Sequence, residues 1–332
     1  MTKWLALCVL PLLISLIMSR LIIHYFGRRL LDEPNIRSSH QTPTPRGGGI
    51  ALAGGVVITA LMVLGLRQIE PDEVYWLLIP SGLIAVLGIC DDLFNLQVGI
   101  RLAIQFLLAG LGMYFIGTND ELPPPIQLLL PGVMILFIVW MTNLYNFMDG
   151  INGLAALEAI SVCVSMAFIY WMQAISWGVI YLLIIIASSA CGFLFWNFPK
   201  AKLFMGDAGS LFLGLSFGLL VIESSSENIR LAVAWLIMLG VFIVDASYTL
   251  TSRIITRQVV HQAHRTHAYQ KITTIFNSHT KTTLTIVGIN SFWLLPIAIA
   301  VTFTQLNSIA ALLIAYAPLL LLAQKLRAGR VA

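Results

Sequence analysis

Long apolar runs alternate with short polar segments along almost the whole chain. Each run is long enough to cross the roughly 30 Å hydrocarbon layer of a bilayer as a helix. The runs begin near residues 4, 48, 75, 100, 126, 154, 177, 207, 230, 284 and 307. This pattern predicts an all-α, polytopic integral membrane protein with about eleven transmembrane helices.

The first run, residues 4–23, is longer than the apolar core of a signal peptide and lacks a small-residue cleavage site. We therefore expect it to be retained as a membrane span. No internal repeat and no soluble segment of domain size interrupts the pattern, so we expect a single membrane-embedded domain over residues 1–332.

Composition supports the membrane assignment. The 332 residues are 58% hydrophobic and only 10% charged, with a mean hydropathy of +0.89, whereas a soluble domain carries roughly a quarter of charged residues. If the loops alternate between two sides, one side holds all the Lys and Arg residues except Lys3, Arg67 and Arg230. The positive-inside rule makes that side cytoplasmic. The net charge of +4 is therefore a topology signal and does not indicate a nucleic-acid partner.

The four cysteines lie in apolar runs without paired spacing, which indicates neither a disulfide framework nor a zinc framework. The candidate chemistry lies instead in the predicted cytoplasmic loops. The first, residues 27–49, ends in Arg46 and the glycine triplet 47–49. Three glycines allow the backbone to approach a ligand or a neighbouring helix closely, and a basic loop entering a tightly packed span would explain the triplet equally well.

The second cytoplasmic loop opens with Asp91 and Asp92, directly after the third span, and Arg101 begins the next span. Adjacent carboxylates at the end of an apolar run are costly unless a cation or water compensates their charge. An acidic helix end and a positive-inside anchor are the simpler interpretations of these residues.

The third and fourth loops contain more polar groups beside the membrane. Residues 143–153 include Asn146, Asp149 and Asn152, which form either a functional site or a self-satisfied cluster of Asx turns. Residues 197–214 contain Asp207 followed by small residues and an apolar run. The simpler interpretation of this second stretch is a helix N-cap formed by Asp207 or Ser210.

The fifth and longest loop, residues 251–283, is rich in arginine and histidine, including His261. If this loop is helical, His264, His267 and Lys271 lie on one face. That face would suit an anion or a lipid headgroup better than zinc, because Cys and carboxylate ligands are missing nearby. Asp245, inside the ninth apolar run, is either functional or paired with a nearby arginine.

Together the loops place Asp91, Asp92, Asp149 and Asp207 on one membrane face, among basic residues and carboxamides. Carboxylate oxygens suit Mg²⁺, which binds through one or two carboxylates plus substrate phosphates; Mn²⁺ is the alternative metal. The combination predicts phosphoryl transfer at the membrane surface.

Three segments carry a family resemblance: DDLFNL at 91–96, NLYNFMDGINGLAA at 143–156 and FPKAKLFMGDAGSLFLG at 198–214. They resemble the signature loops of the polyprenyl-phosphate N-acetylhexosamine-1-phosphate transferases, glycosyltransferase family 4, in the family's order. The resemblance covers residues 37–271. It implies a Mg²⁺-dependent transfer of a sugar-1-phosphate from a UDP-sugar to undecaprenyl phosphate, with release of UMP, at the bacterial inner membrane.

The resemblance also implies roles for individual residues. Asp207 and Asn152 match metal-binding positions, Asp91 and Asp92 match the catalytic pair, and Phe204 matches an aromatic residue that stacks on uracil. The substrate-binding positions, Phe204 included, are Arg46, Arg101, Asn146, Asp149, Asn197, Phe204, His264, Arg265 and His267.

Two departures from the family pattern change what the resemblance implies, one for the metal site and one for the choice of sugar. Asn152 stands where many bacterial members have a second aspartate, which changes the expected metal geometry. The segment HRTHAYQK at 264–271 replaces a triple-histidine motif and resembles the branch that initiates O-antigen-type polysaccharides on N-acetylhexosamines or 6-deoxy-N-acetylhexosamines.

Two other functions are weighed against the transferase. A transporter for an anionic or lipid-linked substrate would line a path through the bilayer with polar residues, whereas the charges here gather on one face. A polyprenyl-diphosphate phosphatase would need no UDP-sugar and no uracil-stacking aromatic residue. The expected partners are the lipid bilayer, undecaprenyl phosphate and a UDP-N-acetylhexosamine, and the sequence leaves open whether the chain forms a homodimer.

Overall fold

The computed structural model describes residues 2–27, 31–32, 43–67, 69–117, 123–258 and 264–330. Most of the first expected cytoplasmic loop, and His261 in the fifth, lie outside these residues. A two-residue antiparallel pair joins β1 (Leu31–Asp32) to β2 (Thr44–Pro45), and the rest of the described regular structure is helical.

The first half of the chain forms α1 (Thr2–Leu21) with the π-helical turn η1 (Ile22–Phe26), α2 (Gly48–Gly65), the 3₁₀ turn η2 (Pro71–Glu73), α3 (Tyr75–Phe94), α4 (Val98–Ile116), α5 (Pro124–Met148) and α6 (Leu154–Gln173). The second half forms α7 (Trp177–Asn197), α8 (Asp207–Glu227), α9 (Ile229–Met238), α10 (Gly240–Ile255), α11 (Ala268–Phe276), α12 (His279–Ile289), the π-helical turn η3 (Asn290–Leu294), α13 (Leu295–Phe303) and α14 (Ser308–Lys325).

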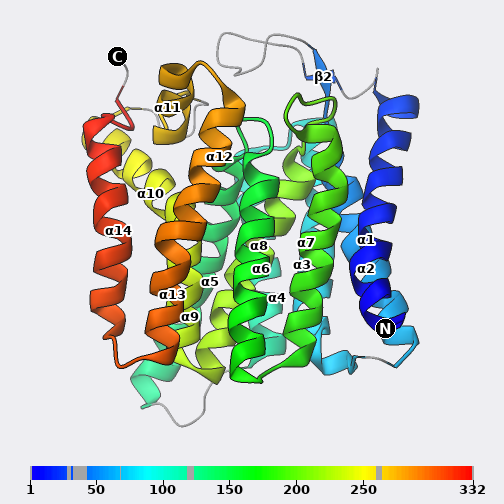
Figure 1. Ribbon diagram of the computed structural model, residues 1–332, viewed down its shortest axis with the longest axis horizontal. Helices are drawn as coiled ribbons and strands as arrows, with labels where there is room; N and C mark the ends of the chain where they lie inside the picture. The colour runs from blue at the N-terminus through cyan, green and yellow to red at the C-terminus, as the bar shows by residue number, and fades with distance from the viewer. Residues whose placement is uncertain are drawn as a thin grey trace.

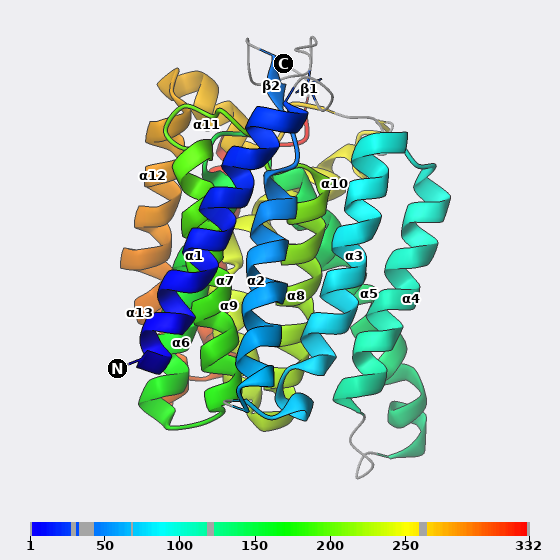
Figure 2. The ribbon, with the colours of Figure 1, turned by 90° about the vertical axis from the view of Figure 1, so that its right-hand side faces the viewer.

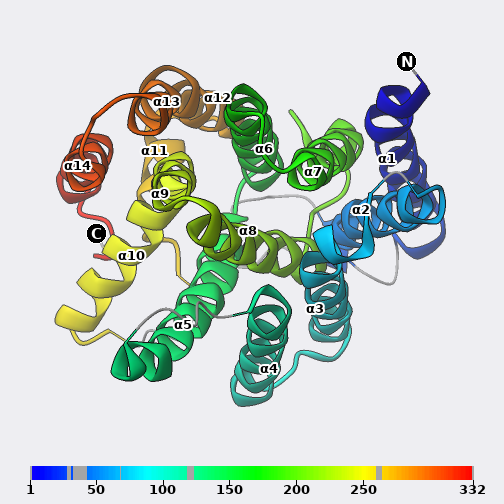
Figure 3. The same cartoon turned by 90° about the horizontal axis from the view of Figure 1, so that it is seen from below.

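The span prediction is confirmed. In the described part of the chain, ten helical segments are long and apolar enough to cross a membrane, and α9 with α10 brings the number to eleven if they count as one span. These two helices meet at an angle of 71°, a bend that the hydropathy pattern does not predict. Seen from below, α10 leans outward from the bundle beside α5 (Figure 3).

The bundle is organised around α8, which lies at its centre among α2, α3, α5 and α9 (Figure 3). In its apolar stretch 83% of the residues are buried, against 22% in α1 and in α14. Since lipid tails are as apolar as a protein core, α1 and α14 can expose their outer faces to the bilayer. Figure 2 shows α1 on the outside of the bundle, where it packs against α2 and α7.

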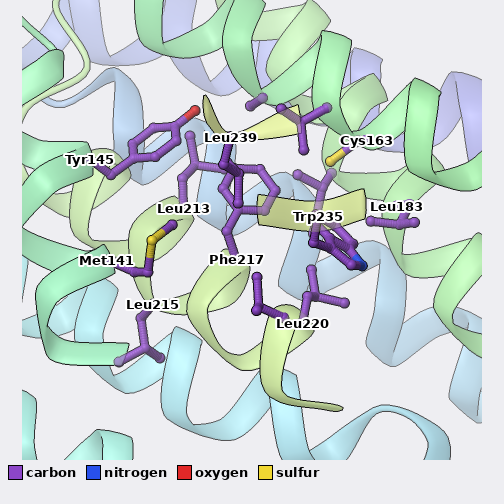
Figure 4. Close-up of a cluster of buried hydrophobic side chains, with 14 of the residues drawn as sticks. Met141, Tyr145, Cys163, Leu183, Leu213, Leu215, Phe217, Leu220, Trp235 and Leu239 are labelled. Carbon is purple, nitrogen blue, oxygen red and sulfur yellow. The ribbon is translucent and has the colours of Figure 1, made fainter. Parts of the chain in front are cut away.

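Buried side chains of α8, among them Phe217, pack against those of α5 and α9 (Figure 4). The Phe217 ring of α8 lies 5.5 Å from the ring of Tyr145 and 6.0 Å from that of Trp235. These three rings are completely buried. They fix α5 and α9 against the central helix, and thereby fix the ends of these helices relative to one another.

The glycine triplet serves a close approach between chain segments. Gly48 and Gly49 donate backbone hydrogen bonds to the carbonyls of Phe204 and Met205, at 2.8 and 2.7 Å. A Cβ atom on Gly49 would lie 2.0 Å from the backbone nitrogen of Gly209 in α8. The segment before α8 is therefore held directly against the start of α2.

Candidate active site

The predicted loops meet at one end of the bundle, the upper end in Figure 1, where β2 and α11 also lie. Asp91 and Asp92 are in the last turn of α3, Asp149 follows α5, and Asp207 is the first residue of α8. Segments more than a hundred residues apart are thus brought together. We call the four carboxylates, with Arg46 and Arg101, the carboxylate site.

Asp207 is joined to two neighbouring helices. Asn146, near the end of α5, donates a hydrogen bond from Nδ2 to Asp207 Oδ1 at 2.8 Å. The same amide group lies 2.9 Å from the Ser210 hydroxyl, one turn into α8. Arg101 from α4 lies 3.7 Å from Asp207 Oδ2. The side chain of Asp207 is therefore held by its neighbours from both sides.

Arg101 connects two of the carboxylates. Its guanidinium donates a hydrogen bond to Asp91 Oδ2 at 2.7 Å, and the other oxygen of Asp91 accepts the backbone N–H of Leu96 at 2.9 Å. Arg101 thus lies between Asp91 and Asp207. It does more than anchor a helix at the membrane surface.

Asp92 caps α8 from another helix. Its Oδ2 atom accepts the backbone N–H of Asp207 at 3.0 Å and lies 3.5 Å from that of Ala208. The N-cap residue itself is Gly206, whose φ is +73° and whose Cβ, if present, would lie 2.6 Å from the Asp92 carboxylate. The expected cap by Asp207 or Ser210 is wrong, because the glycine leaves the capping position open to Asp92.

Asp149 completes the carboxylate site. Its carboxyl group lies deep among protein atoms although part of the residue reaches the surface. Burial, reinforced by the charges of Asp207 and Asp92, raises the pKa of Asp149 well above its usual range, and Arg46 opposes this only in part. Arg46 thus compensates a negative charge on Asp149 only in part, and a bound cation would favour its ionised form.

The carboxylate site could supply only some of the oxygen ligands that a magnesium ion needs. Among the described residues, no three Asp, Glu, His or Cys side chains converge into a ready metal-binding group. Mg²⁺ binds in such places through one or two carboxylates, and water or substrate phosphates supply the remaining oxygens. Asp207 is exposed in part and its backbone N–H binds the Asp92 carboxylate, and its role in holding such an ion stays a prediction.

Asn152 contacts other parts of the chain. Its Nδ2 donates to the Pro199 carbonyl at 3.2 Å. Its backbone N–H and C=O bind His279 and Thr283 of α12, at 3.4 and 3.0 Å. These contacts tie the 143–153 loop to α12, and the proposed metal-binding role of Asn152 stays a prediction.

Asn197 joins the two loops richest in motif residues. Its Oδ1 accepts the backbone N–H of Gly153 at 2.7 Å, and its Nδ2 donates to the Leu203 carbonyl at 2.9 Å. The side chain is only 5% exposed. Its two polar atoms thus bind backbone groups and fix the loops to each other, and contact with a substrate stays a prediction. Phe204, by contrast, is half-buried, and its backbone binds Pro45 and Gly48.

The histidine segment is only partly helical. Helix α11 begins at Ala268 with His267 as its N-cap, so the expected common helical face of His264, His267 and Lys271 is wrong. Lys271 instead donates to backbone carbonyls of the chain segment after α14, at 2.7 and 3.0 Å. His264 and His267 stack with ring centres 5.0 Å apart, and Arg265 is exposed.

Tyr269 makes a contact with the end of α5 that the sequence pattern does not predict. Its hydroxyl donates to the Phe147 carbonyl at 3.2 Å. A Cβ on Gly150 would lie 2.0 Å from the same hydroxyl, so the glycine makes room for it. Burial raises the pKa of the Tyr269 hydroxyl and keeps it neutral. The residue ties α11 to the end of α5.

A groove of about 680 Å³ runs from the carboxylate site along α4 and α5. Its polar lining residues are Arg101, Asn143, Asn146, His264 and His267. The remaining wall is apolar: Val98, Leu102, Phe106, Leu136, Val139, Trp140, Phe147 and Leu250. The groove suits a ligand with an anionic head and a long hydrocarbon tail.

Residues 74–225 match the model of glycosyl transferase family 4. The chain is 32% identical over 269 residues to a probable undecaprenyl-phosphate N-acetylglucosaminyl 1-phosphate transferase of Bacillus subtilis, covering 77% of this chain and 73% of the relative. A decaprenyl-phosphate N-acetylglucosaminephosphotransferase of Mycolicibacterium smegmatis is 28% identical, over 78% and 73% of the two chains. A phospho-N-acetylmuramoyl-pentapeptide-transferase of a Geobacillus strain is 26% identical, over 71% and 78%.

Proposed function

This chain belongs to the polyprenyl-phosphate N-acetylhexosamine-1-phosphate transferases of glycosyl transferase family 4, and we propose that it transfers an N-acetylhexosamine-1-phosphate from a UDP-sugar to undecaprenyl phosphate. The N-acetylglucosaminyl and undecaprenyl-phosphate substrates named for the Bacillus subtilis relative favour these two substrates. UMP is the second product.

The observation that carries the proposal is the junction of the groove and the carboxylate site at Arg101. Its guanidinium contacts Asp91 and approaches Asp207, while the residue also lines the groove. Its Nε–H is buried and has no hydrogen-bond partner among the described residues. A lipid phosphate in the groove would meet the part of the guanidinium that remains exposed, and the prenyl chain would lie along the apolar wall.

The reaction forms one P–O bond and breaks another. An oxygen of the lipid phosphate attacks the phosphorus that carries the sugar, the bridging P–O bond breaks, and UMP leaves. The lipid phosphate is largely dianionic at neutral pH, because its second pKa is near 6, so the attacking oxygen needs little help from a general base. The protein must instead position two anions and offset their charge.

The described residues divide this work. Arg101 and Asn146 lie where the groove meets Asp207 and would orient the lipid phosphate. Asp92 fixes the first turn of α8, which presents Asp207. Arg46 interacts electrostatically with Asp92 and Asp149 and is proposed to bind the diphosphate of the nucleotide-sugar.

Asp207 would hold the magnesium ion, with Asp92 or Asp149 beside it and substrate phosphates supplying further oxygens. When bound, the ion would offset the negative charge of the diphosphate and of the leaving phosphate. Asn152 remains a candidate ligand by its place in the motif. Phe204 is proposed to stack on uracil, and Asn197 to act near it.

We place the carboxylate site on the cytoplasmic side of a bacterial inner membrane, because most Lys and Arg residues belong to that end of the bundle. His264, Arg265 and His267 are proposed to contact the nucleotide-sugar. Their pattern supports a role in starting O-antigen or a related surface polysaccharide, with an N-acetylhexosamine or its 6-deoxy form.

A panel of UDP-N-acetylhexosamines tests the proposal on the purified protein in detergent with undecaprenyl phosphate. We expect UMP release that needs Mg²⁺ and both substrates, and a lipid product whose mass gains one sugar phosphate. The preferred sugar identifies the pathway class. Release of inorganic phosphate from a prenyl diphosphate, without UMP, would contradict the proposal.

A further inference from the structure

Four hydrogen-bond donors converge on the carboxylate of Asp245, which lies inside α10 and is 5% exposed. Its Oδ1 atom accepts the Ala268 backbone N–H at 2.8 Å and the Thr249 hydroxyl at 3.1 Å. Its Oδ2 atom accepts the Tyr269 backbone N–H at 2.9 Å. The fourth group is the Nδ1 atom of His267, 3.2 Å from Oδ1. These four contacts together compensate the buried charge of Asp245.

Two of the four donors belong to the first turn of α11, whose N–H groups have no partners within the helix. Asp245 therefore caps α11 and lies at the positive end of its dipole. A cap alone would need no histidine. The contact with His267 is a separate feature, and it reaches a side chain that lines the groove.

The ring of His267 is enclosed on several sides and is 3% exposed. His264 stacks on it at 5.0 Å and Tyr269 at 5.6 Å, while the Phe147 ring of α5 lies at 6.4 Å. The titratable groups facing the ring are therefore Asp245 from α10, Tyr269 from α11 and His264. With Nδ1 facing Asp245, Nε2 is the ring nitrogen that remains for a ligand in the groove.

Two groups make opposite demands on this ring. The backbone N–H of Gln270 donates to the His267 side chain in the capping box of α11 and requires a lone pair. The Asp245 carboxylate requires a proton on Nδ1. A hydrogen bond to an ionised group is roughly twice as strong as one between neutral groups. The Asp245 carboxylate therefore favours the tautomer that carries a proton on Nδ1.

We propose that Asp245 is a positioning residue for the transfer reaction, which keeps a proton on His267 Nδ1 so that Nε2 can bind a phosphate oxygen of the nucleotide-sugar as an imidazolium N–H. This inference rests on the proposed function, because it assigns the anion to that reaction. Asp245 balances the imidazolium charge without touching the substrate.

Nitrogen-15 NMR of the histidine-labelled protein in detergent tests the proposal without any reaction, with a His267→Gln sample to assign the signals. We expect a protonated Nδ1 in the free protein at pH 7.5, and protonation of Nε2 as well when UDP and Mg²⁺ are added. A free protein in which only Nε2 carries a proton would overturn the proposal. So would an Nε2 signal that UDP leaves unchanged although binding is measured separately.

Kinetics on variants distinguish a positioning role from a purely structural one. Asp245→Asn should lower kcat/KM for the UDP-sugar by about 10- to 100-fold, as the loss of an orienting partner does elsewhere. His267→Gln and the double variant should show the same loss, because Asp245 acts through His267. Losses that multiply in the double variant would mean that Asp245 only caps α11.

Thr249→Val is the matched control. It removes one of the four donors to Asp245 but leaves the His267 contact in place, so kcat/KM should stay within about twofold, well below the loss expected for Asp245→Asn. If Asp245→Asn does not fold, the NMR result on the unchanged protein still decides. If every UDP-sugar fails as a substrate, the proposed function fails, while the protonation of His267 with UDP remains measurable.

Discussion

Asp92 and Asp245 each cap a helix, but the groups that surround the two carboxylates differ. Each is an aspartate inside an apolar helix, and each accepts the first N–H groups of a different helix, α8 for Asp92 and α11 for Asp245. Asp92 lies in the carboxylate site, where other carboxylates crowd it. Asp245 has a histidine and a threonine as further partners.

The difference shows how to interpret a charge in a membrane helix. Burying a carboxylate costs several kcal/mol unless hydrogen bonds or opposite charges compensate it. Around Asp245 the protein itself supplies that compensation. In the carboxylate site two arginines serve four carboxylates, so the charges of the ionised carboxylates are only partly compensated. The excess of carboxylates supports the proposal that the reaction takes place at the carboxylate site, and the compensated charge of Asp245 fits a supporting role.

The largest expected effect is that of Asp207→Asn. Removing one charge from the group proposed to hold magnesium should lower kcat by a factor of hundreds, which corresponds to several kcal/mol. The hydrogen bond from Asn146 to Oδ1 can persist, so the protein should still fold. UMP release and thermal unfolding in detergent measure the two properties.

Asp72→Asn, in the turn at the other end of the bundle, is the control for Asp207→Asn and should be silent. If Asp207→Asn retained more than about a tenth of the activity, the loss would be below 1.4 kcal/mol and a required metal-binding role would be wrong.

The pair Asp91→Asn and Asp92→Asn should come next, with losses of about 10- to 100-fold. Asp92→Asn removes a helix cap and a charge beside Asp207, so we expect a raised Mg²⁺ requirement. Asp91→Asn frees Arg101, so we expect a changed KM for undecaprenyl phosphate. A shifted pH optimum in either variant would instead indicate a general base, and unchanged kinetics in both would leave Asp91 and Asp92 as structural residues.

Much of this arrangement was predictable from the sequence. Eleven apolar runs predict the spans, and Asp207 with the 143–153 segment predicts that the polar loops meet. What a linear pattern does not contain is which helix end meets which. The cap on α8 comes from Asp92, more than a hundred residues away. The side chain of Asn197 binds backbone groups that local sequence does not identify.

The sequence left open whether the histidine segment is helical, for a similar reason. Helical spacing of His264, His267 and Lys271 suggests a common face, but Asp245 captures the N–H groups of Ala268 and Tyr269 and makes the helix begin there. A tertiary contact overrides the local periodicity. The 71° bend between α9 and α10 is equally invisible to hydropathy, because both helices are apolar.

Arg265→Lys addresses the α10–α11 region directly. If the guanidinium binds a diphosphate through two N–H groups, lysine cannot reproduce the contact. The fall in kcat/KM for the UDP-sugar should then correspond to a loss of roughly 1–3 kcal/mol of binding free energy. The KM for undecaprenyl phosphate should change little. Titrating each substrate separately decides the matter. A silent variant would indicate that this exposed side chain only contacts lipid headgroups.

Gly49→Ala tests how tight the α2–α8 contact is. The added Cβ would lie 2.0 Å from the Gly209 nitrogen, which is backbone and cannot move aside alone. We expect a loss of stability of about 1–3 kcal/mol, as overpacking causes, seen as a lower unfolding temperature. Gly99→Ala in α4 is the control, since no described atom beyond its own helix lies within 4 Å of the place that the new methyl group would take. Equal unfolding temperatures would refute the close contact.

The smallest effect should be a pH dependence from His264. Burial, then the neighbouring His267 and Arg253, lowers the pKa of His264 from 6.5 to about 4. Between these values the unfolded chain binds more protons than the folded one, so this contribution to stability is lost as the pH falls from 6.5 towards 4. His264→Gln should therefore make the unfolding temperature less sensitive to pH over that range. His24→Gln, in the turn η1 and far from this segment in sequence, is the control for replacing a histidine elsewhere in the chain. An unchanged slope in His264→Gln would show that burial does not perturb His264.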